Sequence, residues 1–140
     1  MKQFVCFFLI LILGSSTLKK TENDNLGINE ISKTISQSFK GGNSDLLSTC
    51  FNKEIELIID GDKIEFQKLP SNSAKSILNS FFKKNPPLSF SYVYEGKSSS
   101  TLKYCRGNYK SKTSDFFVYM LIKKNNNDKF LISTIQLKKG

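Results

Sequence analysis

The sequence predicts an α+β domain in which an antiparallel sheet packs on three helices. Apolar residues recur at helical spacings of three and four in three segments that all precede Pro86-Pro87. After the prolines, apolar runs alternate with turn residues and no further helical pattern occurs. The order helix, helix, strand, strand, helix and then four strands lacks a strand-helix-strand rhythm, and it is typical of an antiparallel sheet with helices on one face.

The first residues match a secretory signal peptide. Lys2 is followed by ten apolar residues (4–13) and by small residues (14–16), and this run is too short to span a bilayer. An uncleaved interfacial anchor or a buried helix is the alternative. We expect cleavage near Ser16 and export to the periplasm or the extracellular space. The expected divisions are a signal peptide (1–16), a flexible leader (17–27) and a single domain (28–140).

Two helices are expected next. The first ends where Lys40 suits the helix dipole and Gly41-Gly42 can form a left-handed cap. Its apolar stripe consists of Ile28, Ile31, Ile35 and Phe39. The second helix begins with Asn43 or Ser44 as its N-cap. Its buried side is expected to consist of Leu46, Leu47, Cys50 and Phe51.

Residues 54–69 predict a β-hairpin around Asp60-Gly61, because Asp-Gly supplies the positive φ angles of a two-residue type I′ turn. This register places Leu57 opposite Ile64 and Ile55 opposite Phe66, so that the apolar side chains share one face. The carboxylates of this segment fall on the opposite face. We interpret them as a solvated surface, because they lack the spacing of a calcium loop. They are Glu54, Glu56, Asp60, Asp62 and Glu65.

The third helix is expected to begin with Ser71 as its N-cap and to end before Pro86, which has no N–H and forces Asn85 out of the helical region. Its apolar face consists of Ala74, Ile77, Leu78, Phe81 and Phe82. The chain then enters four strands: 88–95, 102–110, 116–124 and 130–138. Turn residues separate them at 96–100, 111–114 and 125–128.

Several of these segments resemble an uncharacterised family of short secreted bacterial proteins, the domain of unknown function 4783, within the NTF2-like, cystatin-like cone superfamily. The resemblance covers about residues 28–138. It rests on Gly42-Asn43, Leu46, Leu47, Phe51, the run FFKKNPPLSF (81–90), Tyr104, Gly107, 118–124 and 130–137. It implies a curved sheet wrapped around helices, sometimes with a pocket inside, and it implies no activity. Arg106 departs from the family pattern, which favours an aliphatic residue there.

The residue inventory argues against most enzyme classes. The chain has no histidine, so Ser-His and Cys-His nucleophilic systems and His-ligated metals are excluded. No Walker or Rossmann glycine pattern and no C-x-x-C motif is present. We therefore predict no catalytic residues, no metal site and no cofactor.

The candidates for ligand binding are Tyr92, Tyr94 and Arg106. Phe90, Tyr92 and Tyr94 are expected on one strand face, where the two tyrosines would line a concavity, although ordinary core packing is the alternative. Arg106, the only arginine, could clamp a carboxylate or phosphate if it points inward, or lie on the solvated surface. After cleavage, Cys50 and Cys105 could form one disulfide, or remain two small buried side chains.

The basic character is confined to the C-terminal half. The formal net charge is +9, and residues 83–140 carry eleven lysines and one arginine against three carboxylates. These lysines could form a positive rim that binds anionic polysaccharide or lipid surfaces weakly, or they could serve only the solubility of the protein. We expect no specific nucleic-acid binding, since lysine alone provides little planar recognition.

The expected function is that of an exported envelope protein with a non-catalytic domain that binds a ligand or a partner, of unknown identity. The alternative is a small-molecule enzyme with its pocket inside the cone, lined by Tyr92, Tyr94 and Arg106. A concavity filled by side chains would argue against the enzyme, and an open pocket with convergent polar groups would favour it.

Overall fold

The computed structural model describes residues 27–140. The expected signal peptide (1–16) and nearly all of the expected leader (17–27) lie outside these residues. Residues 31–140 form one compact unit, and the fold described below is that of this unit. None of the helices within residues 27–140 has the length and hydropathy of a bilayer-spanning segment.

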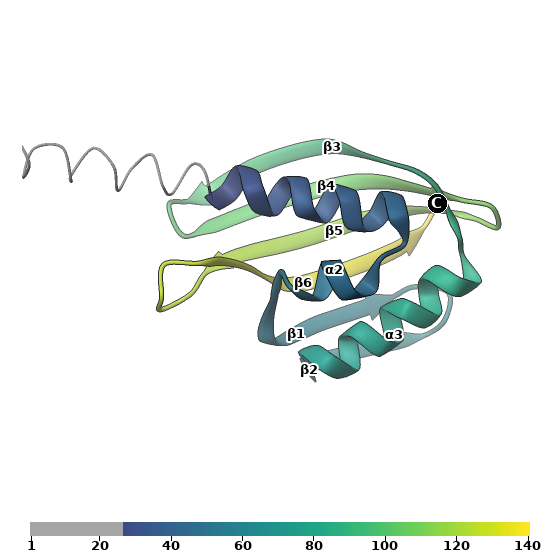
Figure 1. Ribbon diagram of the computed structural model, residues 1–140, viewed down its shortest axis with the longest axis horizontal. Helices are drawn as coiled ribbons and strands as arrows, with labels where there is room; N and C mark the ends of the chain where they lie inside the picture. Colours follow the sequence, from purple (N-terminus) through teal and green to yellow (C-terminus); the bar gives the residue numbers. More distant parts are fainter. Residues whose placement is uncertain (1–26) are drawn as a thin grey trace, which may run out of the picture. The chain divides into compact units, whose positions relative to one another are not determined.

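Residues 31–140 form three helices and six strands (Figure 1). Residues 27–41 are helical, of which 31–41 belong to this unit, α2 covers Ser44–Ser48 and α3 covers Ser71–Lys84. The strands are β1 Phe51–Ile59, β2 Ile64–Pro70, β3 Pro87–Ser99, β4 Leu102–Ser111, β5 Asp115–Lys124 and β6 Phe130–Lys139. This is the predicted order of elements, and the α+β fold class is confirmed.

The strands form one curved sheet in the order β2-β1-β6-β5-β4-β3, with the helices on one face (Figure 1). We call the helix-covered side the inner face and the other side the outer face. All neighbouring strands pair antiparallel except β1 and β6, which pair parallel from Phe51 opposite Ile132 to Ile59 opposite Leu137. This parallel pair, which the sequence did not indicate, joins the β1–β2 hairpin to the rest of the sheet.

The predicted register of the β1–β2 hairpin is wrong. Ile59 lies opposite Ile64 and Leu57 opposite Phe66, so the turn contains four residues instead of two. The φ angles of Gly61 (94°) and Lys63 (56°) are both positive. Because Lys63 also adopts a turn conformation, the turn extends beyond the Asp-Gly dipeptide. The shift is by two residues, so the apolar side chains stay on the predicted face.

Two helix boundaries also differ from the predictions. The helix α2 is short, and Phe51 begins β1 instead of completing the buried side of the helix. Its N-cap is Asn43, as predicted, because Asn43 Oδ1 accepts a hydrogen bond from Leu46 N at 3.0 Å. In α3 the N-cap position is Pro70, and Ser71 is the first helical residue without a side-chain cap.

The core between helices and sheet is rich in aromatic rings. Phe39 of the first helix is fully buried and lies 4.9 Å from the Phe90 ring in a stacked arrangement. Phe39 also contacts Phe82 and Tyr109 edge-on, at 5.7 Å and 5.9 Å between ring centres. Such pairs each add about 0.5–1.5 kcal/mol beyond the burial of their surface. Gly107 of β4 is required here, since a Cβ would lie 2.6 Å from the Phe90 ring.

The joint between α3 and β3 is held by Asn85. The Asn85 amide N–H and the side-chain Nδ2 both donate to the Phe81 carbonyl, at 2.8 Å and 3.2 Å, and so end the helix. Thr113 Oγ1 donates to Asn85 Oδ1 at 2.6 Å, and the Tyr109 hydroxyl donates to the Asn85 carbonyl at 2.5 Å. Asn85 therefore ties the helix to the β4–β5 turn, as a nearly buried amide with satisfied hydrogen bonds.

Candidate functional site

The inner face of the sheet is filled by side chains. The strand residues that point toward the helices are at most 1% exposed at the centre of the sheet. They include Leu57, Tyr109, Val118, Met120, Ile135 and Leu137. A space of this kind has no room for a substrate, because protein interiors pack to the density of organic crystals.

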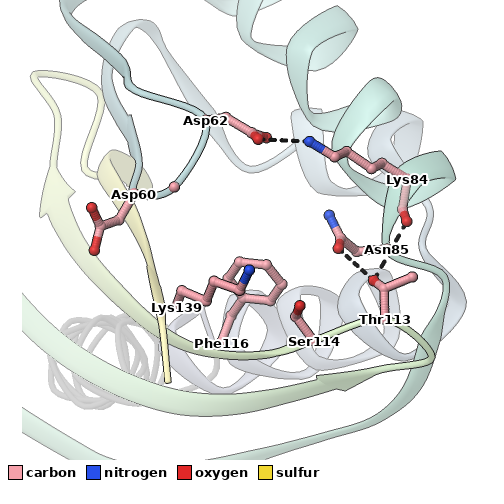
Figure 2. Close-up of a pocket in the computed structure, with 9 residues that line it drawn as sticks. Asp60, Asp62, Lys84, Asn85, Thr113, Ser114, Phe116 and Lys139 are labelled. Atoms are coloured by element: carbon pink, nitrogen blue, oxygen red, sulfur yellow. Dashed lines mark hydrogen bonds and ion pairs between the residues drawn. The ribbon is translucent and has the colours of Figure 1, made fainter.

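A polar hollow lies at one end of the sheet, outside this core (Figure 2). Its volume is about 260 Å³. It forms where the β1–β2 turn, the end of α3, the β4–β5 turn and the end of β6 meet. We call it the end hollow, bounded chiefly by Asp60, Asp62, Lys84, Asn85, Ser114 and Lys139.

An ion pair crosses the rim of the end hollow. Lys84 Nζ lies 2.7 Å from Asp62 Oδ1, and so joins the last residue of α3 to the β1–β2 turn. The Lys84 side chain is 66% exposed, and an exposed pair of this kind contributes roughly 0–1 kcal/mol to stability. The pair therefore shapes the rim more than it stabilises the fold.

Further hydrogen-bond donors line the end hollow beside and below this pair. Figure 2 shows the Asn85 amide nitrogen and the Ser114 hydroxyl pointing into the end hollow. Asn85 Nδ2 uses one of its two N–H groups on the Phe81 carbonyl, so one N–H stays available. The Ser114 hydroxyl has no hydrogen-bond partner within residues 27–140.

Lys139 supplies a second cation. Its side chain extends into the end hollow. The aliphatic part of the side chain passes close to the β1–β2 turn, since a Cβ added to Gly61 would lie 3.9 Å from Lys139 Cδ. Its ammonium has no carboxylate partner among the residues that the structure describes. The carboxylate of Asp60 points away from the other lining groups in Figure 2. Phe116, which is nearly buried, adds an apolar wall.

Tyr92 and Tyr94, expected on one strand face, lie on opposite faces of the sheet. A register shift between them makes Val93 a bulge residue, so Tyr92 lies opposite Gly107 and Tyr94 opposite Arg106. The Tyr92 hydroxyl points toward the first helix and donates to the Ser32 carbonyl at 2.6 Å. The Tyr94 side chain is 56% exposed on the outer face. The expectation that they share a concavity is therefore wrong, while a ligand-binding role for either tyrosine stays a prediction.

Arg106 lies on the outer face, opposite Tyr94, so it does not point inward as a carboxylate or phosphate clamp inside the cone would require. Its guanidinium carbon is 5.4 Å from the centre of the Phe117 ring and 5.9 Å from that of Tyr119, distances at which cation–π attraction contributes. Its Nε is buried without a hydrogen-bond partner within the described chain. Stacking on two aromatic rings accounts for the position of this arginine, and a binding role for it stays a prediction.

The two cysteines are free and buried. The disulfide that the sequence allowed between Cys50 and Cys105 is therefore not formed in the structure. Burial raises the pKa of the Cys105 thiol to about 12, and burial also raises the pKa of the Cys50 thiol. Both thiols are thus kept neutral and unreactive, as small apolar side chains are.

Sequence patterns missed two sets of polar residues. The end hollow combines four segments that are far apart in the chain, and its Asp60 and Asp62 were interpreted only as a solvated face. Lys103 was missed as well. Its side chain is only 9% exposed, and its Nζ lies 3.0 Å from Ser32 Oγ and 3.5 Å from Glu95 Oε1. One signal was available, since Lys103 shares the strand parity of buried Cys105.

Within residues 27–140 no group of three or more acidic or cysteine side chains is placed to hold a metal ion. What the end hollow offers is ammonium, amide and hydroxyl donors around a small space with one aromatic wall. That arrangement can bind and orient a small polar molecule.

The comparisons with known proteins agree with this fold. A family model described as "Domain of unknown function (DUF4783)" matches residues 32–138. None of the curated proteins compared with the chain matches it. A crystal structure of a DUF4783 family protein from Bacteroides ovatus is similar with a TM-score of 0.70 and 22% identity, over 76% of this chain and 93% of that chain.

More distant structures share the architecture. An NTF-2 like protein of unknown function from Silicibacter pomeroyi has a TM-score of 0.62 and 7% identity, over 86% of this chain and 98% of that chain. A domain of unknown function with a cystatin-like fold from Nostoc punctiforme has a TM-score of 0.65 and 9% identity, over 84% of this chain and 78% of that chain. These likenesses concern the fold alone. The chain belongs to the DUF4783 family and has the NTF2-like, cystatin-like α+β fold.

Proposed function

We propose that the protein is exported to the bacterial envelope and binds a ligand or a partner there without catalysing a reaction. The observation that carries the proposal is the contrast between the filled inner face and the open end hollow. Binding needs a small number of placed polar groups, and the hollow provides them.

The enzyme alternative has less support. It required Tyr92, Tyr94 and Arg106 to line one pocket inside the cone, and the bulge at Val93 separates them. The groups with raised pKa values are the buried Cys50, Cys105 and Tyr109 and the half-buried Tyr92, and desolvation is the first cause of each shift. These side chains are part of the core, where a substrate would have to displace packed residues.

Native mass spectrometry of the protein recovered from its own envelope fraction tests the proposal. We expect a mature chain that begins near Thr17, together with a co-purifying small molecule or partner protein. A chain that starts at Met1 in the cytoplasmic fraction would contradict the export part. A chain that carries nothing, and whose envelope extract yields no binder to the immobilised protein, would contradict the binding part.

A further inference from the structure

Most of the groups that face the end hollow without a partner can donate hydrogen bonds. Lys139 contributes an ammonium, Ser114 a hydroxyl, and Asn85 one amide N–H that its contact with Phe81 leaves available. Lys84 adds two further N–H groups beyond the one that contacts Asp62. A ligand that satisfies this set must present acceptor oxygens, and charge-assisted bonds favour an anionic one.

The two carboxylates of the hollow do not cancel this preference. Asp62 is already occupied by Lys84 at 2.7 Å, and the Asp60 carboxylate points away from the other lining groups (Figure 2). The Lys139 ammonium is left as a cation without a carboxylate partner within residues 27–140. The excess of lysine over carboxylate in residues 83–140 further raises the local concentration of anions.

The size and the apolar wall of the hollow narrow the ligand class. A volume of about 260 Å³ equals the space of roughly eight water molecules, so a ligand of up to about eight non-hydrogen atoms fits. Phe116 offers an apolar surface that an inorganic ion would leave unused. We propose that the end hollow binds a small organic carboxylate, with its carboxylate held by Lys84 and Lys139 and its short apolar part against Phe116.

This inference rests on the proposed binding function and gives it a ligand class. It also differs from diffuse attraction of anions to a basic surface, because the chain contains matched lysines. Lys83 and Lys138 are the chain neighbours of Lys84 and Lys139, are exposed as those two are, and do not line the end hollow. Replacing either pair removes the same net charge from almost the same place.

The test is an NMR titration of the exported protein with three probes that each contain four carbons: butyrate, n-butanol and n-butylammonium, at constant ionic strength. We expect butyrate to produce saturating shifts at the amides of Gly61, Lys84 and Ser114, with a dissociation constant of about millimolar size. The neutral and cationic probes should produce none. Inorganic phosphate, which lacks an apolar part, should bind more weakly than butyrate.

The variants separate the site from the surface field. Lys84→Gln with Lys139→Gln should weaken butyrate binding about tenfold, the size expected for losing charge-assisted hydrogen bonds. Lys83→Gln with Lys138→Gln should change it less than twofold. Equal losses in both double variants, equal binding of butanol, or phosphate binding as tight as butyrate would each overturn the inference.

Failure of this inference can be told apart from failure of the binding function. An envelope-purified protein that carries a cationic or neutral ligand, or a partner seated away from the end hollow, contradicts the carboxylate site and leaves the binding function standing. Butyrate shifts that are absent, together with envelope protein that carries no ligand, contradict both.

Discussion

The inner face of the sheet and the end hollow meet at Asn85 and Phe116, but they are built from opposite kinds of residues. The inner face is closed by aromatic and aliphatic side chains that contact one another, such as Phe39 and Phe90 at 4.9 Å. The hollow is open and is edged by long charged side chains on exposed turns and helix ends. The comparison indicates that stability resides in the first region, so the second can vary in chemistry without loss of the fold.

The largest expected effect is in the inner face. Phe81 is 3% exposed and its ring lies 4.9 Å from that of Phe116, so Phe81→Ala should lower the free energy of unfolding by about 3–5 kcal/mol. Urea denaturation followed by circular dichroism measures this. The matched control is Phe66→Ala on the edge strand β2, where Phe66 is 45% exposed and the loss should be below about 1 kcal/mol. Similar losses for both would remove the contrast between core and surface.

The next effect is at the border between the two regions. Asn85→Ala removes the bonds to Phe81 and Thr113 in a nearly buried position, and should cost about 1–3 kcal/mol. Asn127→Ala, in the exposed β5–β6 turn, is the control and should be within about 0.5 kcal/mol of the parent. A neutral Asn85→Ala would mean that the prolines alone hold the joint.

A pH dependence should distinguish the buried thiol from the open hollow. The pKa of Cys105 is about 12 when folded and near 9 when unfolded, so the folded state retains a proton that the unfolded state loses. Stability is therefore full below pH 9 and falls as the pH rises toward 12. From pH 8 to pH 10 we expect a loss of about 1.4 kcal/mol from this group.

Urea melts of the parent and of Cys105→Ala at both pH values isolate this contribution. The variant should lose about 1.4 kcal/mol less than the parent over the same interval. Identical losses would show that the thiol is not the group responsible. The neighbouring Tyr92, whose pKa burial also raises, would then be the next candidate.

The smallest expected effect is at the rim of the end hollow. Lys84→Gln breaks the ion pair with Asp62 and should change the free energy of unfolding by less than about 1 kcal/mol, because the pair is exposed. Lys83→Gln is the control. A loss above about 2 kcal/mol for Lys84→Gln alone would mean that the rim is structural, contrary to the contrast drawn above.

The sequence predicted most of the fold, because local chemistry decides most of it. The prolines end α3, Asn43 caps α2, and the apolar runs mark the later strands. The errors arose where one residue changes the geometry of its neighbours. Lys63 adopts a positive φ, which a lysine does not predict. The bulge at Val93 places Tyr94 on the outer face. The pairing of strands far apart in the sequence, such as β1 with β6, cannot be predicted from the residues of either strand.

The candidate site was harder to predict than the fold. Tyr92, Tyr94 and Arg106 were selected by residue type and strand parity, and parity fails beyond a bulge. The end hollow depends on the meeting of Lys84, Asp62, Ser114 and Lys139, which belong to four segments. Each of these residues is ordinary in its own segment. Only their juxtaposition gives the hollow its preference for anions.

The parallel pairing of β1 with β6 also constrains how the chain folds. β1 follows α2 early in the sequence, and β2 pairs with one of its edges. The other edge has no hydrogen-bonding partner until β6, the last strand in the chain order, has been synthesised. Contacts of such high sequence separation slow folding, because the chain must lose the entropy of a long loop before the contacts form. The domain is therefore expected to complete its sheet only after β6 has been synthesised.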